Sequence, residues 1–322
     1  MRRVFETVRE ALPKQLDTRV VHCPTPEHST WWLPKGMVRA WTQQGEVNHI
    51  VGDVHYAALG LPGSKCILTV HDLNHLDDLH GVRKALYRWV YFALPLRRCA
   101  VITAISETTR NRLVEEFPFT AGRIFVIVDP LPKGYEPQCS VFNEKYPRIL
   151  QVGSATNKNV GRLVNAITGL DCKLHIIGTM SNEIRKHLEV NRIDFENSID
   201  ISDEEMLRAY IRADMVVFSS LAEGFGMPII EANAVGRPVV TSNIEPMVSV
   251  AGGAACLVDP QNPASIRSGI LRVIEDREYR EGIVRIGFEN AKRFNADAVA
   301  RSYFAVYQEL ALASERDRRR WF

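Results

Sequence analysis

The chain has 322 residues, 46% of them hydrophobic and 24% charged, which is the composition of a soluble globular protein with enough apolar material for two domains. Its 40 Lys and Arg residues against 38 Asp and Glu residues leave a formal charge of +2, so the overall charge does not predict a nucleic-acid partner. The six cysteines form no C-x-x-C pair, which argues against a zinc site and is typical of free thiols in a reducing compartment.

Short β-branched segments alternate with stretches of helical periodicity, which predicts parallel α/β sheets. In the first part of the chain the predicted strands are residues 18–23, 49–53, 66–72, 101–106 and 124–128. The predicted helices of this part are residues 3–12, 82–95 and 107–116, and Ser106 is expected to cap the last of them. A proline-rich segment without periodicity, residues 129–146, is the predicted linker.

The same alternation restarts after the linker. Strands are predicted at residues 148–153, 173–178, 215–219, 237–242 and 255–258, with helices at residues 159–167, 203–211, 228–235 and 264–275. We therefore expect two α/β domains of Rossmann-like type, at residues 1–143 and 144–303. A carboxy-terminal helix at residues 304–322 can pack back on the first domain. Ligands of such folds bind at the carboxyl ends of the strands.

The segment E-G-F-G-M-P-I-I-E places Glu223 and Glu231 on either side of the start of a short predicted helix. Pro228 suits the first turn of that helix, because its missing N–H costs nothing there. Gly224 and Gly226 let the backbone approach a ligand closely, and the N–H groups at the helix start favour a phosphate. Carboxylates suit the vicinal hydroxyls of a ribose or a sugar, so two acids that flank a phosphate site indicate a nucleotide-sugar.

The alternative interpretation of this segment is an ordinary strand–loop–helix connection with two solvated glutamates. For the E-x7-E spacing alone this alternative is the better one, because such spacing is common by chance. The neighbouring segments favour the nucleotide-sugar.

Longer segments resemble a known family. S-S-L-A-E-G-F-G-M-P-I-I-E-A-N-A-V-G-R-P resembles the E-x7-E signature of the retaining glycosyltransferases of the GT-B fold, in the large family four group. R-I-L-Q-V-G-S-A-T-N-K-N-V-G-R-L, A-G-G-A-A-C-L-V-D-P, T-V-H-D-L and I-T-A-I-S-E-T-T-R resemble other segments of this family, in the family's order. The resemblance covers nearly the whole chain and implies two Rossmann-like domains whose parallel sheets face a central cleft.

The resemblance places the expected donor site in the second domain. Glu231 would hold the nucleotide ribose, and Glu223 would hold hydroxyls of the donor sugar. Lys158 matches the lysine that neutralises the diphosphate, whereas Ser154 stands where many members carry an arginine and others a small hydroxyl residue. The remaining expected donor-binding residues form the loop itself, with backbone N–H groups offered by the last two: Gly224, Phe225, Gly226 and Met227.

In the first domain, His71 matches a histidine that approaches the reacting sugar, so His71 and Glu223 are the expected catalytic residues. A lone histidine at a strand end is more often structural, but its place beside Asp72 favours function. Asp53, His55 and Asp72 are expected to line the acceptor side, and for Asp53 and His55 a structural role is about as well supported. The family begins with a β-strand that this chain lacks before its first helix, so the strand is lost or the chain starts inside a longer product.

The segment V-R-K-A-L-Y-R-W-V-Y-F-A-L-P-L-R-R, residues 82–98, mixes basic and aromatic residues, and the tail R-D-R-R-R-W-F, residues 316–322, repeats this chemistry. One interpretation is a core-packing helix with a solvated basic rim. The other is a face that rests on an anionic membrane surface. No signal peptide or membrane-spanning run of roughly 18–20 apolar residues is present, so we expect a cytoplasmic protein that is at most peripheral on the inner face of the membrane.

These observations predict a retaining hexosyltransferase that uses a nucleotide diphosphate-sugar and a saccharide or lipid-linked acceptor, in surface polysaccharide or glycolipid synthesis. Similarity to mannosyltransferase-like members favours GDP-mannose over a UDP-hexose as the donor. No metal or other cofactor is expected, because Lys158 and the helix start would stabilise the leaving diphosphate. The alternatives are an inactive nucleotide-sugar-binding subunit that assists a partner transferase, and a phosphorylase that uses free phosphate on the same fold.

Overall fold

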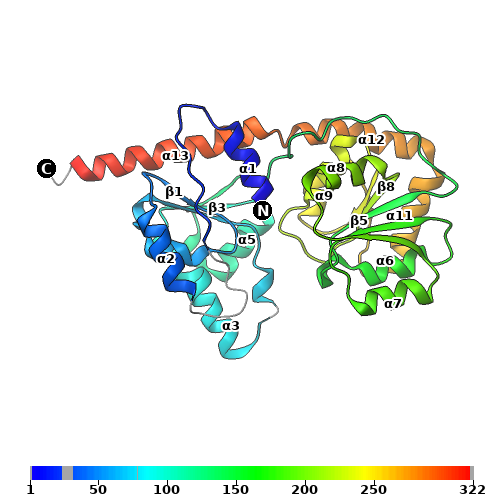
Figure 1. Ribbon diagram of the computed structural model, residues 1–322, viewed down its shortest axis with the longest axis horizontal. Coiled ribbons are helices and arrows are strands. Elements are labelled where there is room, and N and C mark those ends of the chain that lie inside the picture. The colour runs from blue at the N-terminus through cyan, green and yellow to red at the C-terminus, as the bar shows by residue number, and fades with distance from the viewer. Residues whose placement is uncertain (1, 24–31, 78, 320–322) are drawn as a thin grey trace. The chain divides into compact units, whose positions relative to one another are not determined.

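The computed structural model describes residues 2–23, 32–77 and 79–319 (Figure 1). Contacts divide the chain into two units, Met1–Pro130 together with Ala296–Phe322, and Leu131–Asn295. Each unit contains a parallel sheet covered by helices. The α/β fold class predicted from the sequence is therefore confirmed.

The first unit has a four-stranded parallel sheet in the order β1-β2-β3-β4. Its strands are β1 (Asn48–Ile50), β2 (Cys66–Val70), β3 (Val101–Ala104) and β4 (Ile124–Val126). Its helices are α1 (Arg2–Ala11), α2 (Trp32–Thr42), α3 (Gly81–Tyr87), α4 (Leu94–Arg98), α5 (Glu107–Glu116) and α13 (Ala296–Arg319). A π-helical stretch, Arg88–Ala93, joins α3 to α4, and 3-10 turns lie at His55–Gly60, Gly63–Lys65, Asn74–Leu76 and Pro118–Thr120.

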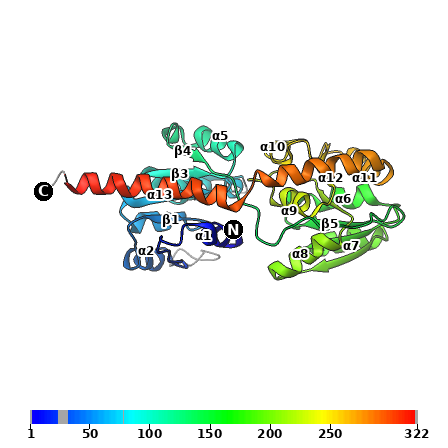
Figure 2. The same ribbon diagram turned by 90° about the horizontal axis from the view of Figure 1, so that it is seen from above.

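The two faces of this sheet are buried by different helices, because successive strand residues point to opposite sides. From β2, Leu68 and Val70 enter a core that also contains Phe92 and Leu113, on the side of α4 and α5. Ile67 enters a second core with Tyr303 and other residues of α1 and α13. Figures 1 and 2 show α13 running across the strands of this unit with α1 beside it. The carboxy-terminal helix is thus part of the first unit.

The second unit has a six-stranded parallel sheet in the order β10-β9-β8-β5-β6-β7. Its strands are β5 (Arg148–Val152), β6 (Lys173–Ile177), β7 (Asp194–Ser198), β8 (Met215–Phe218), β9 (Val239–Ser242) and β10 (Cys256–Val258). Its helices are α6 (Val160–Ile167), α7 (Asn182–Val190), α8 (Asp203–Arg212), α9 (Met227–Val235), α10 (Met247–Ala251), α11 (Pro263–Glu275) and α12 (Arg277–Lys292). A 3-10 turn, Thr156–Lys158, precedes α6. The sheet grows outward in one direction from β5 and in the other from β8, so the strand order switches between these two neighbours. Ligands of open α/β sheets bind at the carboxyl ends of the strands beside such a switch.

The proline-rich segment after Pro130 packs on the second unit. The Arg237 guanidinium donates to the Ser140 hydroxyl at 2.6 Å, and Arg280 pairs with Glu144 at 2.7 Å. Contacts therefore assign residues 131–143 to the second unit, whereas the sequence-based boundary lies after residue 143. Proline content and lack of periodicity indicate irregular backbone, and they carry no information on what that backbone contacts.

Two sequence predictions in the first unit are wrong. Residues 18–23 pair with no strand of the described ranges, and Val20 is 54% exposed. Their β-branched residues favour an extended backbone, but a strand forms only where a neighbouring strand pairs with it. Residues 82–95 form no single α-helix but change to the π-helical stretch before Pro95. Proline has no N–H to donate to the carbonyl four residues earlier, that of Tyr91, and the His55 ring nitrogen Nδ1 lies 3.1 Å from this oxygen instead.

Candidate active site

The loop that enters α9 adopts the backbone geometry expected of a ligand-binding turn. Gly226 is the N-cap of α9 with φ 132°, a conformation that side chains with a Cβ rarely adopt, and its carbonyl accepts from the Ile229 N–H at 2.9 Å. Phe225 is 3% exposed and packs edge-on against Phe294 with ring centroids 5.5 Å apart, which anchors the loop. Gly224 and Met227 are half-buried on either side. The predicted helix at residues 228–235 is present and begins one residue earlier, at Met227.

Lys158 and Glu223 form an ion pair at the switch between β5 and β8. Lys158 Nζ lies 2.6 Å from Glu223 Oε1, with side-chain exposures of 21% and 13%, and 4.8 Å from the centroid of the Phe218 ring. Gly153, with φ 87°, lies against the aliphatic part of the Lys158 side chain. A Cβ at this position would come within 2.8 Å of Lys158 Cε, so only glycine leaves room for the lysine. The two sequence-predicted residues thus lie together, although 65 residues separate them in the chain.

Two asparagines fasten the Lys158 loop to the Glu223 loop. Asn157 Nδ2 donates to the carbonyl of Ala222 at 2.9 Å, and its own carbonyl accepts from the N–H of Leu221 at 2.8 Å. Asn159, with φ 61°, is buried and donates to the carbonyl of Ser219 at 2.9 Å. These bonds fix where the lysine can lie relative to the loop. Neither asparagine was among the site residues predicted from the sequence, although both flank Lys158 in the N-K-N segment.

Glu231 is buried within the second unit. It is 2% exposed, and its Oε2 accepts a hydrogen bond of 2.6 Å from the hydroxyl of Tyr210, which is fully buried on α8. A hydrogen bond to an ionised group is among the stronger ones in a protein interior. Tyr210 therefore holds the Glu231 carboxylate in one orientation. Nothing in the spacing of Tyr210 marks it as a partner of Glu231.

Ser154 connects the ends of two strands. Its hydroxyl donates to the carbonyl of Thr179 at 2.6 Å, which joins the loop after β5 to the loop after β6. Gly178 lies against this hydroxyl, since a Cβ there would approach Ser154 Oγ to 2.9 Å. Ser154 thus lies between the ends of β5 and β6 and supplies no second cation beside Lys158.

In the first unit, His71 follows β2 directly and is 8% exposed. Its Nδ1 lies 4.0 Å from Oδ2 of Asp129, and Phe5 of α1 packs edge-on against its ring at 5.7 Å between centroids. Burial lowers the pKa of His71 to about 3, so the ring is neutral at pH 7. Burial also raises the pKa of Asp129 to about 7. Asp129 was not among the site residues predicted from the sequence.

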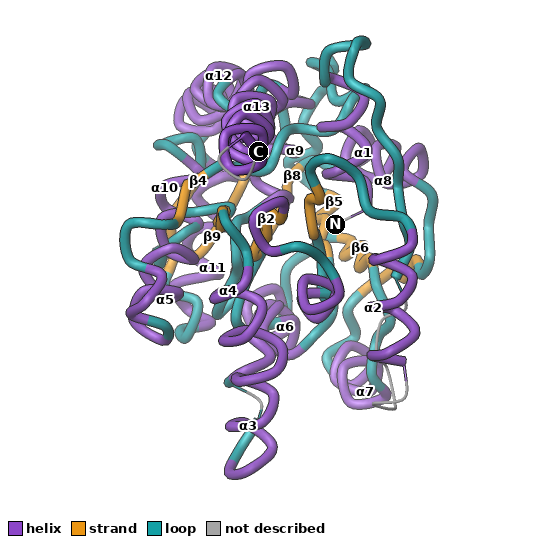
Figure 3. The backbone as a smooth tube through the Cα atoms, turned by 90° about the vertical axis from the view of Figure 1, so that its left-hand side faces the viewer, coloured by secondary structure: helices purple, strands orange, loops and turns teal. Residues whose placement is uncertain are grey.

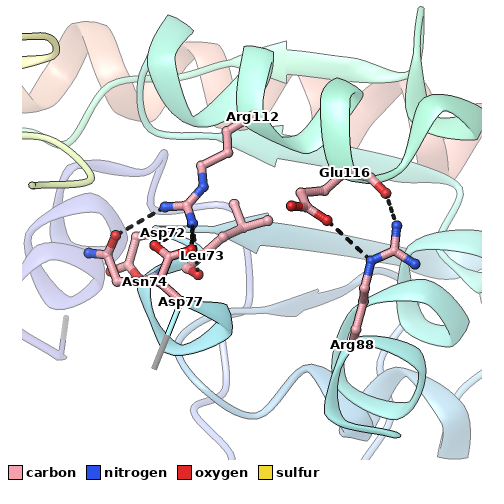
Figure 4. A network of polar contacts seen from close by, with 7 residues as sticks. All are labelled: Asp72, Leu73, Asn74, Asp77, Arg88, Arg112 and Glu116. Carbon is pink, nitrogen blue, oxygen red and sulfur yellow. Dashed lines mark hydrogen bonds and ion pairs between the residues drawn. The ribbon is translucent and has the colours of Figure 1, made fainter. Parts of the chain in front are cut away.

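The loop after His71 is held by hydrogen bonds that Figure 4 shows in close-up. The Asp72 carboxylate accepts from the N–H of Asn74 at 2.9 Å. Arg112 of α5 donates to the Asn74 side chain at 3.2 Å and to Asp77 at 2.5 Å. On the same helix, Glu116 pairs with Arg88 at 3.2 Å. Helix α5 thus fixes the segment that carries His71 and Asp72.

The residues expected on the acceptor side lie in different environments. Asp53 is exposed. His55 is 6% exposed, with its ring edge-on to Phe92 at 5.0 Å and its Nδ1 near the Tyr91 carbonyl. The contact with the Tyr91 carbonyl gives the buried His55 ring a structural role that needs no sugar acceptor. The assignment of Asp53, His55 and Asp72 to the acceptor side stays a prediction. Among the described residues, no group of three or more His, Cys, Asp and Glu side chains is arranged to hold a metal ion.

Comparison with known proteins identifies the family. The family model described as Glycosyltransferase Family 4 matches residues 7–129, and the model described as Glycosyl transferases group 1 matches residues 135–289. The O-antigen chain mannosyltransferase B of Escherichia coli is 37% identical over 255 residues, which cover 72% of this chain and 67% of that protein. The chain therefore belongs to the glycosyltransferase family that these two models describe, family four and group 1.

Solved structures agree with this assignment at the level of the fold. Sucrose-phosphate synthase from Thermosynechococcus elongatus superposes on this glycosyltransferase with a TM-score of 0.74, at 18% identity, over 88% of this chain and 79% of that one. Anabaena Alr3699/HepE, solved in complex with UDP and glucose, also has a TM-score of 0.74, at 15% identity, over 86% of this chain and 81% of that one. The GT-B fold and the glycosyltransferase family predicted from the sequence are confirmed, and the retaining mechanism stays a prediction.

Proposed function

We propose that this glycosyltransferase moves a hexose from a nucleotide diphosphate-sugar to a saccharide or lipid-linked acceptor, with retention of the anomeric configuration. Mannose is the first candidate, since the relative from Escherichia coli is named a mannosyltransferase of the O-antigen chain. A GDP- or UDP-linked donor is proposed, and the structural neighbour solved with UDP and glucose supports this class of donor. The product would belong to a surface polysaccharide or a glycolipid.

The observation that carries the proposal is the Lys158–Glu223 ion pair beside the start of α9. A diphosphate that binds at Lys158 replaces Glu223 as the partner of the cation. The Glu223 carboxylate is then available to accept hydrogen bonds from the hydroxyls of the donor sugar. Glu231, oriented by Tyr210, would hold the ribose. Glu231 on α9, Lys158 on the loop after β5 and Glu223 on the loop after β8 can thus bind the ribose, the diphosphate and the sugar, in that order.

In the proposed reaction the bond between the anomeric carbon and the diphosphate oxygen breaks, and the acceptor oxygen bonds to this carbon on the same face. The acceptor proton passes to the departing diphosphate. Negative charge grows on the diphosphate as it leaves, and Lys158 and the first N–H groups of α9 stabilise it, so these residues supply the electrostatic assistance that a metal gives elsewhere. His71 is proposed to contact the reacting sugar as a neutral ring.

The experiment that tests this proposal measures donor binding in a matched pair of variants. Lys158→Met should weaken binding of a nucleotide diphosphate by about 10- to 150-fold, the range expected for losing a hydrogen bond to a charged group. The control is Lys292→Met, which breaks another Lys–Glu pair of 2.6 Å that is 70% and 71% exposed. Calorimetry with GDP-mannose and UDP-glucose should show the loss only for Lys158. Equal affinity in the two variants would contradict the site, and binding without sugar transfer would favour the inactive subunit.

A membrane surface as a second partner is also proposed, from an exposed face of α3 and the π-helical stretch. Val82, Leu86 and Trp89 are 84%, 60% and 54% exposed at the spacing of one helix face, and Arg83 beside them is exposed too. Residues 79–106 contain no Asp or Glu. Figure 3 shows α3 at the far end of its unit from the strands of its own sheet. Apolar side chains of this kind insert into a membrane surface, and the basic side chains around them are attracted to anionic lipid headgroups.

Sedimentation with vesicles tests this face. The wild type should sediment with anionic phosphatidylglycerol vesicles, less so with neutral vesicles, and salt should release it. Val82→Ser, Leu86→Ser and Trp89→Ser together should abolish sedimentation, whereas Val190→Ser, at a site 71% exposed in the second unit, should not. Unchanged sedimentation of the triple variant would refute this face. No helix in the described part of the chain has the length and apolarity to cross a membrane, and the side chains of residues 316–322 lie outside what the structure describes.

A further inference from the structure

The surroundings of His71 carry an inference that rests on the proposed function and adds a residue to it. Asp129 lies beyond the carboxyl end of β4, where the N–H of Ile127 still bonds to the Ala104 carbonyl of β3 at 2.9 Å. His71 lies beyond the carboxyl end of β2, on the other side of β3. The carboxylate and the ring therefore meet across the end of the central strand.

Both groups are buried, since their side chains are 6% and 9% exposed for Asp129 and His71. The Asp129 carboxylate faces one particular ring nitrogen, Nδ1, at 4.0 Å. The other ring nitrogen, Nε2, is buried and has no hydrogen-bond partner among the described residues. A buried polar atom without a partner requires an explanation, and a ligand that supplies the partner is one of the few available.

The neutral state of the ring makes the choice of nitrogen important. A neutral imidazole carries one proton, and the nitrogen without it is a hydrogen-bond acceptor. An ionised carboxylate near Nδ1 favours the proton on Nδ1, and at 4.0 Å the Asp129 carboxylate acts through its charge and not through a hydrogen bond. The lone pair is then on Nε2, the atom that has no partner. Phe5 at the ring edge and the Thr109 hydroxyl bonded to the His71 carbonyl at 3.2 Å limit rotation of the residue.

We propose that Asp129 is a positioning residue that keeps the proton of His71 on Nδ1, so that Nε2 accepts a hydrogen bond from a hydroxyl of the donor sugar. Asp129 touches neither donor nor acceptor in this proposal. A donor sugar that offers a hydroxyl at this point is favoured over a deoxy sugar, because the buried Nε2 would stay unpaired with the latter.

The most direct test is the protonation site of His71, read from nitrogen-15 NMR shifts of histidine-labelled wild type, with His71→Ala to assign the signal. At about pH 8.5, above the pKa of about 7 to which burial raises Asp129, we expect the Nδ1–H form in the wild type and a shift toward the Nε2–H form in Asp129→Asn. An Nε2–H ring in the wild type would overturn the proposal. This measurement needs no turnover, so it separates a failure of this inference from a failure of the proposed function.

Kinetics give the second test. Asp129→Asn should lower kcat/KM for sugar transfer by about 10- to 100-fold and leave nucleotide affinity unchanged. In a His71→Ala background the same change should alter kcat/KM by less than about twofold, because the two residues act as a unit. Equal losses in both backgrounds would mean that Asp129 acts without His71. The control is Asp17→Asn, which removes an exposed carboxylate of the same unit and should leave kcat/KM unchanged.

Discussion

Replacing Tyr210 by Phe removes one oxygen from a fully buried ring and nothing else. The lost hydroxyl donates to Glu231 at 2.6 Å, and Glu231 is 2% exposed, so water cannot readily take its place. A hydrogen bond to a charged group in such a setting contributes about 1.5–3 kcal/mol. The edge-on contact of the Tyr210 ring with Tyr135, at 5.7 Å, remains in the variant. The predicted loss of stability therefore comes from the hydroxyl and not from the packing of the ring.

The chain offers a matched control for this change. The hydroxyl of Tyr146 also donates to a carboxylate, that of Asp194, at 2.6 Å, but Tyr146 is 43% exposed. For a unit of this size each kcal/mol lowers the midpoint of thermal unfolding by roughly 2–4 °C, so Tyr210→Phe should lower it by about 3–12 °C. Tyr146→Phe should cost within about 0.5 kcal/mol, as expected of surface changes.

Differential scanning calorimetry of both variants, followed by nucleotide titration, makes the comparison. Glu231→Gln keeps the shape of the side chain and should weaken nucleotide binding by about 10- to 150-fold. Tyr210→Phe should weaken it less, because the carboxylate is still present. Equal thermal shifts for Tyr210→Phe and Tyr146→Phe would refute the argument that Tyr210 holds the buried acid.

Three further outcomes are expected. Gly226→Ala should cost about 1–3 kcal/mol in urea unfolding because φ is 132° there, whereas Gly282→Ala, in a helix with open space around it, should stabilise slightly. Burial raises the pKa of Asp129 to about 7, so the stability that comes from its protonated form is fully present below about pH 4 and is lost as the pH rises through 7. The free energy of unfolding of Asp129→Asn, relative to that of the wild type, should therefore rise by roughly 2 kcal/mol between pH 5 and pH 7 in urea unfolding. A difference between the two proteins that does not change with pH would contradict the burial of Asp129. His71→Ala and Glu223→Ala should each lower single-turnover rates far more than nucleotide affinity, and wild-type rates in either variant would remove that residue from the site.

Local signals in the sequence predicted much of the second unit. Pro228 and Gly226 mark the start of α9, and the strands on both sides have apolar β-branched runs, so their positions are recoverable to within one or two residues. The family resemblance brought Lys158 and Glu223 together, and the structure places them 2.6 Å apart. Strand β7 was not predicted, because its sequence, D-F-E-N-S, has mostly charged and polar residues and lacks the β-branched run of the other strands. Its place at the edge of the sheet tolerates this composition.

Contacts between residues far apart in the chain were not predictable in the same way. Tyr210 reaches Glu231 from another helix, and Asp129 reaches His71 across the end of β3. Neither pair has a characteristic spacing, because the distance is set by how the strands are ordered in the sheet. His55 shows a related effect, since its neighbour Tyr91 lies 36 residues away in the chain and in a stretch whose helix type changes before Pro95.

Proton NMR of the reaction with GDP-mannose or a UDP-hexose, and a saccharide acceptor or water, tests the central claim most directly. We predict that the nucleotide diphosphate is released, that the sugar first appears with the anomeric configuration it had in the donor, and that Lys158→Met slows this release. An inverted product, or release of sugar phosphate from an oligosaccharide with free phosphate and no nucleotide, would contradict it.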